Sequence, residues 1–387
     1  MRFNRRQFLI AAGAAAAPMA FAKKNALEEH IVERVETGKA NYRWPRFVGK
    51  NARKDFHGQD KRAGYCRIIT TQGAVGWAES LPWIAEKLKD QIIGKKVSEL
   101  IAPGVGCSPG VSEHYDLALH DLMGVILNKP VYQLLGAMGT RETSIYSGMI
   151  YFDELNEDGS LEQLLANCEW DFDYGYRALK VKIGRSGKWY PHTEGLAMDI
   201  KVVRSIHEQF KGRDVTILVD SNDQYSPDDA KAFLKGIDGI PLYWFEEPFR
   251  ETVADGRAFR KWMNENGFKD TRYADGEYDA DDDVLLELGR SGDLDVYLPD
   301  IRGYGGLTRW VNVMPKLAGM GVKASPHTWG SKLKTHYVAH LAAGVGNVDI
   351  IEGVTCLSDD IDFGDYPIQD GKIRVSDAPG FGMKLLT

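Results

Sequence analysis

Cysteine is scarce in this sequence. The 387 residues include only four cysteines, at positions 66, 107, 168 and 356, and no two of them form a Cys-x-x-Cys pair. Structural zinc sites usually take their ligands from such closely spaced pairs. The cysteine pattern therefore argues against a zinc-binding domain.

An excess of basic residues is also missing. The chain has 48 Lys and Arg residues against 55 Asp and Glu residues, which gives a formal net charge of -7. We find no stripe of basic residues interleaved with aromatic residues, which is the usual surface for binding a phosphate backbone. A nucleic-acid partner is therefore not expected.

Long apolar runs are absent except near the N-terminus. There, an apolar run from Phe8 to Phe21 follows Arg5 and Arg6 and leads into an Ala-x-Ala sequence that ends at Ala22. The run is too short to span a membrane comfortably. Basic residues, apolar run and cleavage sequence are the parts of a twin-arginine (Tat) signal peptide.

We therefore predict a signal peptide over residues 1–22 and export by the Tat machinery. The mature protein is expected to be periplasmic and to contain no membrane segment, because no other part of the sequence is apolar enough. The alternative is that residues 1–22 form a helix of the mature protein.

A glycine-rich nucleotide-binding loop is missing too, although the chain contains 41 glycines. What the chain does contain, after Thr143, is short apolar segments that alternate with longer amphipathic ones. This alternation predicts a parallel α/β barrel. A doubly wound open sheet is the weaker alternative, because such sheets usually carry a nucleotide fingerprint. The predicted strands are 144–150, 178–183, 215–220, 242–247, 271–277, 295–300, 322–327 and 348–353.

The residues before the barrel form a separate predicted unit with both strands and helices. Two strands meet at Gln72 and Gly73, and apolar residues at helical spacing predict helices over 112–136. We predict an α+β domain over residues 23–141 and the barrel over residues 142–355. The C-terminal segment, residues 356–387, is expected to fold back onto the first domain.

Two lysines lie two positions apart in the strand at 178–183. Lys180 and Lys182 share one face of that strand, because successive side chains alternate. Neighbouring ammonium groups repel each other, and burial adds to the cost. A second such pair, Lys332 and Lys334, illustrates the ordinary alternative, a solvated surface. The first pair is of interest only if carboxylates converge on it.

Carboxylates do occur at the ends of the predicted strands, which meet at one rim of a barrel. Asp220, Glu246 and Glu277 come from three successive strands and would repel one another without a cation. Oxygen ligands of this kind suit Mg²⁺. The alternative is that they cap helices in the loops. The full series at the strand ends is Lys180, Lys182, Asp220, Glu246, Glu247, Glu277, Asp300, His327 and Glu352.

Two groups at this rim are predicted to act as acids or bases. A cation and Lys180 would disfavour the charged form of Lys182, so its pKa is expected to fall toward the range of a working base. Asp300 and His327 end adjacent strands, where the carboxylate would fix the imidazole tautomer and raise its basicity. The acidic run 279–283 is interpreted instead as the solvated start of a helix.

These motifs, in this order, resemble the enolase superfamily and, within it, the mandelate racemase-like subgroup (the mandelate racemase/muconate lactonizing enzyme family). The segment 116–136 also resembles a helical segment of that family's capping domain. The matching motifs are Lys-Val-Lys at 180–182, Val-Asp-Ser-Asn at 219–222, Trp-Phe-Glu-Glu-Pro at 244–248, Asp-Gly-Glu at 275–277, Leu-Pro-Asp at 298–300, Ser-Pro-His-Thr-Trp at 325–329 and Ile-Ile-Glu-Gly at 350–353.

The resemblance implies a modified (β/α)8 barrel of the (β/α)7β type under an α+β capping domain, built from the N-terminal region and the C-terminal tail. It implies one Mg²⁺ per subunit on Asp220, Glu246 and Glu277. It also implies bases at Lys182 and at His327, the latter paired with Asp300, while Lys180 and Glu352 face the substrate carboxylate or enolate oxygen. A homo-oligomer is expected.

The chemistry implied is removal of the proton α to a carboxylate, which gives an enediolate. Loss of the neighbouring hydroxyl would make the protein an acid-sugar (aldonate or aldarate) dehydratase, the favoured interpretation. Return of the proton would make it a racemase or epimerase, and ring opening a cycloisomerase. An exported, non-catalytic sugar-acid binding protein is the alternative from another class, but it would need neither Lys182 nor the Asp300–His327 pair.

Substrate contacts are predicted from two regions. Residues 38–62 would supply the loops that close over the site, and their basic, polar character suits a hydroxylated anion, the small sugar acid expected as partner. Two further candidates lie within the motifs at the barrel rim. The predicted substrate-binding residues are Arg46, Lys50, Arg53, His57, Asn222 and Trp329.

Overall fold

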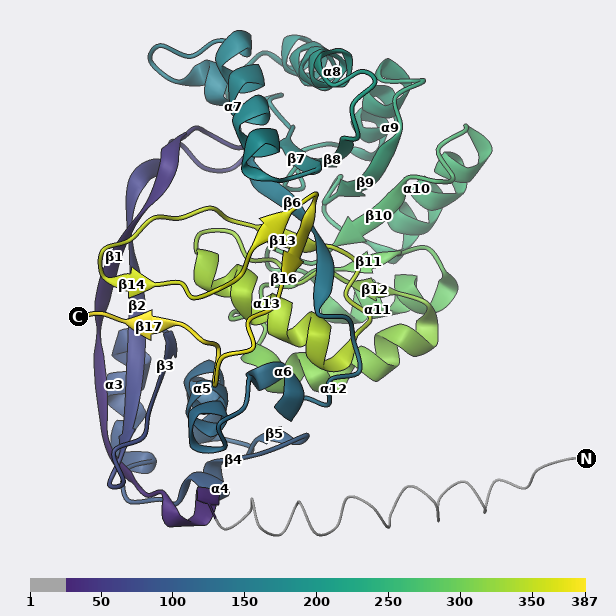
Figure 1. The fold of residues 1–387 in the computed structure, drawn as a ribbon. Coiled ribbons are helices and arrows are strands. Elements are labelled where there is room, and N and C mark those ends of the chain that lie inside the picture. Colours follow the sequence, from purple (N-terminus) through teal and green to yellow (C-terminus); the bar gives the residue numbers. More distant parts are fainter. Residues whose placement is uncertain (1–25) are drawn as a thin grey trace, which may run out of the picture.

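A computed structural model describes residues 26–387 (Figure 1). The predicted signal peptide, residues 1–22, lies outside these residues. Within residues 26–387, no helix is long and apolar enough to cross a membrane. Figure 1 shows an antiparallel sheet standing along one side of a barrel.

Residues 142–353 form the barrel, and each predicted strand is present. Parallel neighbours run in the order β12-β11-β10-β9-β8-β7-β6, and β13 pairs with β6. A bridge between Ala324 and Val348 joins the two ends of this series. The elements are β6 (Glu142–Ile150), α7 (Leu161–Tyr174), β7 (Ala178–Lys182), α8 (His192–Gln209), β8 (Thr216–Asp220), α9 (Pro227–Gly236), β9 (Leu242–Glu246), α10 (Val253–Glu265), β10 (Arg272–Asp275), α11 (Asp282–Ser291), β11 (Val296–Tyr297), α12 (Gly306–Met320), β12 (Lys323–Ala324), α13 (Lys332–Val345) and β13 (Ile351–Gly353).

The alternation of side chains along the strands divides the barrel core into two layers. In β7, Leu179 and Val181 belong to the cluster that packs against the surrounding helices. Inward positions on neighbouring strands, such as Leu218 and Trp244, form a second cluster inside the barrel. Because Lys180 alternates with the outward residues Leu179 and Val181, its side chain points into the barrel.

The first domain is built on a three-stranded antiparallel sheet in the order β1-β2-β3. Its strands β2 and β3 are joined at Gln72 and Gly73, as predicted, and α5 packs against β3. We call residues 26–141 the cap. Its elements are β1 (Val32–Val48), β2 (Gly58–Thr70), β3 (Val75–Glu79), α3 (Pro82–Leu88), η1 (Lys89–Gln91), α4 (Val97–Leu100), β4 (Ile101–Ala102), β5 (Gly106–Cys107), η2 (Val111–Tyr115), α5 (Asp116–Ile126) and α6 (Val131–Leu134).

The C-terminal segment contacts both domains. Strand β14 (Ile361–Asp362) pairs with β17 (Lys384–Leu385) and lies against β1, as the predicted return to the cap requires. The hairpin of β15 (Ile368–Gln369) and β16 (Lys372–Arg374) instead joins the barrel, where β16 pairs with the first three residues of β6. Strand β13 pairs only with the next three residues of β6. The hairpin thus covers backbone groups that the barrel alone leaves unpaired.

The acidic run after β10 begins a helix, as predicted. The side chain of Asp281 accepts hydrogen bonds from the backbone N–H groups of Asp283 and Val284, at 3.0 and 3.2 Å. Asp282 and Asp283 lie in the first turn of α11, where the helix dipole favours negative charge. This run therefore caps and begins α11.

Candidate active site

The register of the barrel brings the predicted residues together at one rim. Lys182 pairs with Asp220 across β7 and β8, and Asp220 pairs with Glu246 across β8 and β9. Glu277 follows the end of β10 by two residues. These positions lie at the carboxyl ends of parallel strands, where the catalytic groups of such barrels collect.

The side chains of Asp220, Glu246 and Glu277 each place an oxygen within 4.8 Å of the others. Asp220 and Glu246 are completely buried. Burial and the neighbouring Asp220 carboxylate raise the pKa of Glu246 well above its usual range. The Oε2 atoms of Glu246 and Glu277 are buried without a hydrogen-bond partner among the described residues. Buried, unpaired carboxylate oxygens at this spacing fit a hard divalent cation.

Lys180 lies next to these three carboxylates, and its ammonium group binds two carboxylates, Glu246 and Glu352. Its Nζ atom is 2.8 Å from Glu246 Oε1 and 3.0 Å from Glu352 Oε1. Burial raises the pKa of Glu352, but Lys180 and His327 lower it by more, to about 2. Lys180 and Glu352 thus form a buried ion pair, and the Lys180 ammonium group stays charged.

Lys182 donates a hydrogen bond to Asp220 Oδ2, and its Nζ atom is 4.0 Å from Glu277 Oε2. Burial lowers the pKa of Lys182, but the Asp220 and Glu277 carboxylates raise it by more. This direction is opposite to the fall expected from the sequence. The expected fall rests on a cation, which would cancel the negative charge of the same carboxylates.

His327 lies on the other side of Glu277. Its Nδ1 atom is 3.1 Å from Asp300 Oδ2, and its Nε2 atom is 3.3 Å from Glu277 Oε1. Burial lowers the pKa of His327, but Glu277 and Glu352 raise it by more. Nε2 is buried without a hydrogen-bond partner among the described residues. Lys182 Nζ and His327 Nε2 therefore lie near the two different carboxylate oxygens of Glu277.

The loop between β1 and β2, residues 49–57, lies over this rim. Arg53 donates from Nε to the backbone oxygen of Asn222 at 2.8 Å, and its guanidinium group forms an ion pair with Asp223. Trp189 donates to the backbone oxygen of Asn51 at 2.8 Å. The Lys50 ammonium group lies 4.1 Å from the centre of the Trp189 ring. Arg53 and Lys50 thus hold the loop against the barrel.

A group of aromatic rings borders the site beside Lys182. The Tyr151 ring lies 5.6 Å from Lys182 Nζ, and its centre is 4.6 Å from that of Trp329 and 4.7 Å from that of His57. Burial lowers the pKa of His57 to about 4, so this imidazole is neutral near pH 7. The sequence indicated His57 and Trp329 here but not Tyr151, which directly follows β6.

Two predicted substrate contacts differ in their surroundings. Asn222 donates to Glu247 Oε2 at 3.3 Å, and its Oδ1 atom is buried with no partner among the described residues. Arg46, in contrast, donates two hydrogen bonds of 2.7 Å to Asp171 and one to the backbone of Met149. The prediction for Arg46 is therefore corrected: its guanidinium group joins the cap to α7.

A second set of carboxylates was not predicted as a group. Asp223, Glu247 and Asp275 place oxygens within 4.8 Å of one another, beside the first set. The donors differ from those of the first set, where the buried lysines Lys180 and Lys182 bind Glu246 and Asp220. In the second set, the donors are the guanidinium group of Arg53 for Asp223, the backbone N–H of Tyr278 for Glu247 and the hydroxyl of Tyr273 for Asp275.

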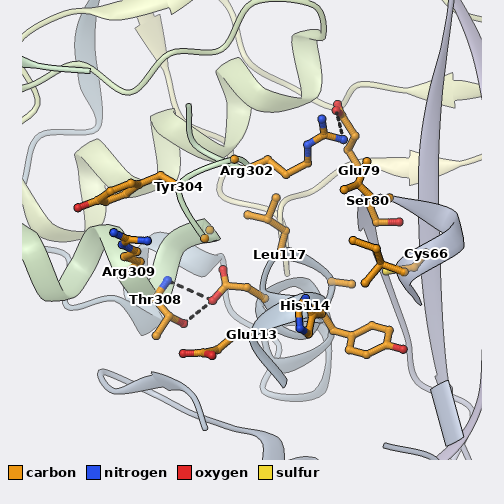
Figure 2. A pocket seen from close by; sticks show the side chains of 18 of the residues that line it. Cys66, Glu79, Ser80, Glu113, His114, Leu117, Arg302, Tyr304, Thr308 and Arg309 are labelled. Carbon is orange, nitrogen blue, oxygen red and sulfur yellow. Dashed lines mark hydrogen bonds and ion pairs between the residues drawn. The ribbon is translucent and has the colours of Figure 1, made fainter. Parts of the chain in front are cut away.

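A pocket of about 450 Å³ lies elsewhere, between the cap and α12 (Figure 2). None of the carboxylates of the rim lines it. Arg302 reaches across it to Glu79 at 3.3 Å, and Asp116 accepts hydrogen bonds from the backbone and the side chain of Thr308. The polar groups in Figure 2 therefore join the cap to the barrel, and the chemistry is assigned to the rim.

Comparisons with known proteins place the chain in a family. The model of the family described as "Enolase C-terminal domain-like" matches residues 163–386. An arabinonate dehydratase of Saccharolobus solfataricus is 25% identical over 81% of this chain and 86% of its own length. A hydrophobic dipeptide epimerase of Enterococcus faecalis is 25% identical over 73% of this chain and 79% of its own.

Solved structures of a galacturonate dehydratase from Geobacillus sp. are also similar. A mutant complexed with Mg is 27% identical, with a TM-score of 0.86 over 93% of this chain and 94% of that chain. A complex with D-galacturonate and 5-keto-4-deoxy-D-galacturonate is 28% identical, with a TM-score of 0.85 over 92% of this chain and 95% of that one. The chain therefore belongs to the enolase superfamily, among its mandelate racemase-like enzymes.

Proposed function

We propose that this protein is a Mg²⁺-dependent acid-sugar dehydratase. The observation that carries the proposal is the position of Lys182 and His327 on two sides of Glu277, with Nζ 4.0 Å from one oxygen and Nε2 3.3 Å from the other. One group can remove a proton while the second delivers a proton to a leaving hydroxyl. A protein that only binds sugar acids needs no such pair.

Each protein group has a distinct part in this reaction. Lys182 takes the proton α to the substrate carboxylate, and the charged Lys180 stabilises the enediolate that results. His327 donates its Nε2 proton to the β-hydroxyl, which leaves as water. When bound to Asp220, Glu246 and Glu277, Mg²⁺ would supply positive charge to the enediolate oxygens. The product is an α-keto acid that lacks the β-hydroxyl.

Two features support an acid sugar as substrate. The loop of residues 49–57 brings Lys50 and Arg53 to the rim, and the rings of Tyr151 and Trp329 border it. The similar arabinonate and galacturonate dehydratases act on sugar acids. The alternative is an epimerase, as in the dipeptide epimerase, in which His327 returns a proton to the α-carbon.

The proposal is tested with a library of aldonates, aldarates and uronates in deuterated buffer containing Mg²⁺. Keto-deoxy product from at least one member is the expected result, detected by NMR and by semicarbazide trapping. Deuterium at the α-carbon with inversion and no keto product would identify an epimerase. Binding of a sugar acid with neither exchange nor product would identify a passive binding protein.

Export is a separate proposal, supported by the sequence of residues 1–22 alone. Changing Arg5→Lys and Arg6→Lys together is expected to retain the precursor in the cytoplasm, because the Tat machinery reads the arginine pair. Cell fractionation measures the distribution, and N-terminal sequencing of the exported parent protein is expected to begin at Lys23. Export of the double variant at the parent level would contradict the Tat route.

A further inference from the structure

Lys334 is a buried lysine on α13 whose role the proposed reaction leaves open. It is the third residue of the helix, and only 8% of its side chain is exposed. Burying an ammonium group is costly unless the group is paired. The sequence suggested a solvated surface for Lys332 and Lys334, so the burial of Lys334 is a correction that requires a partner.

The partner is Asp300. Lys334 Nζ is 2.7 Å from Asp300 Oδ2, the same oxygen that lies 3.1 Å from His327 Nδ1. The other oxygen, Oδ1, accepts from the backbone N–H groups of Arg302 and Gly303 at 3.0 and 2.7 Å. An ionised carboxylate accepts about four hydrogen bonds. Asp300 is therefore fully occupied, and its orientation is fixed from two sides.

This arrangement determines where the imidazole of His327 points. Because Nδ1 binds the fixed oxygen of Asp300, Nε2 is directed toward Glu277. Without Lys334, Oδ2 would keep His327 as its only hydrogen-bond partner among the described side chains, and water would replace the ammonium group. The backbone N–H groups of Arg302 and Gly303 would still hold Oδ1, but Oδ2 would lose its charged partner, so the oxygen that orients the imidazole would be held less tightly.

We propose that Lys334 is a positioning residue: through Asp300, its ammonium group places His327 for delivery of a proton to the leaving hydroxyl. The assignment of that proton transfer rests on the proposed function, whereas the contact among Lys334, Asp300 and His327 does not. Loss of an outer hydrogen-bond partner of this kind usually costs about 10- to 100-fold in activity.

Lys332 provides a matched control from the same helix. Its ammonium group lies 5.4 Å from the centre of the Phe363 ring and makes no hydrogen bond to Asp300. Lys332→Met and Lys334→Met therefore remove the same charge from positions two residues apart. Only the second change removes the contact with Asp300.

The first test compares two rates in these variants. Lys334→Met is expected to slow dehydration about 10- to 100-fold while α-deuterium exchange, which needs Lys182, stays within about twofold of the parent. Lys332→Met is expected to change neither rate. Equal losses of exchange and dehydration in a folded Lys334→Met protein would show a general structural role and overturn the proposal, as would unchanged dehydration.

The second test needs no substrate. In protein labelled with ¹⁵N-histidine, the ring nitrogens of His327 are identified by their loss in His327→Asn. Their ¹⁵N shifts are expected to move in Lys334→Met and to stay in place in Lys332→Met, because the shifts report the hydrogen bond at Nδ1. Unmoved shifts in Lys334→Met would overturn the positioning role. If the shifts move in Lys334→Met but the parent protein converts no acid sugar, the positioning role is upheld and the proposed function is rejected.

Discussion

Lys182→Met is expected to lose both α-deuterium exchange and dehydration, whereas His327→Asn is expected to lose dehydration alone. Lys182 is the proposed base, so no enediolate forms without it. His327→Asn leaves Lys182 and the three carboxylates in place, so the α-proton still exchanges while the hydroxyl leaves without an acid. Dehydration should fall by about 100-fold or more, the usual contribution of a positioned acid. NMR in deuterated water measures both rates.

The same two variants also test whether Lys182 and His327 have exchanged roles. Exchange that is lost in His327→Asn and kept in Lys182→Met would assign the base to His327 and imply the opposite configuration at the α-carbon. Full dehydration by both variants would remove this rim from the mechanism. Thermal unfolding of each variant serves as the control for folding, because both side chains are buried.

Chelation of divalent cations is expected to abolish activity, and Mg²⁺ is expected to restore it. Within the rim, Asp220 and Glu246 are completely buried and repel each other unless a cation or Lys180 and Lys182 balance their charge. Glu246→Gln keeps the shape of the side chain but removes one negative charge. Its affinity for Mg²⁺, measured by isothermal titration calorimetry on the resting protein, should fall about tenfold or more, the low end of the known effects of altering a metal site.

Glu79→Gln is the matched control for this measurement. Glu79 is also a buried carboxylate, but it lies in the separate pocket and pairs with Arg302. Its replacement should leave the affinity for Mg²⁺ unchanged. Full activity of Glu246→Gln in excess chelator would contradict the assignment of the three carboxylates.

The strands and the charged residues at their ends were predictable because both signals are local in sequence. Apolar runs define the strands, and the parallel topology then brings Lys182, Asp220 and Glu246 to neighbouring positions whatever the details of packing. The prediction that the acidic run 279–283 begins a helix is confirmed, since Asp281 caps α11.

Partners distant in the sequence were not predictable. Arg46 lies in a basic segment that suits an anionic substrate, but Asp171, 125 residues away, already binds its guanidinium group. For Lys334, the Lys-x-Lys pattern gives no information about burial on a helix, where residues two positions apart point in different directions. Tyr151 is an aromatic residue just after a strand, and such residues are more often part of a core.

The loop of residues 49–57 links the passage of substrate to contacts between the cap and the barrel. The bonds from Arg53 to the Asn222 backbone and from Trp189 to the Asn51 backbone cross directly from one domain to the other. Each bond is worth about 1 kcal/mol, and the Arg53–Asp223 ion pair and the contact of Lys50 with the Trp189 ring add to them. We therefore expect the rate of the whole cycle to depend on the opening of this loop as well as on proton transfer.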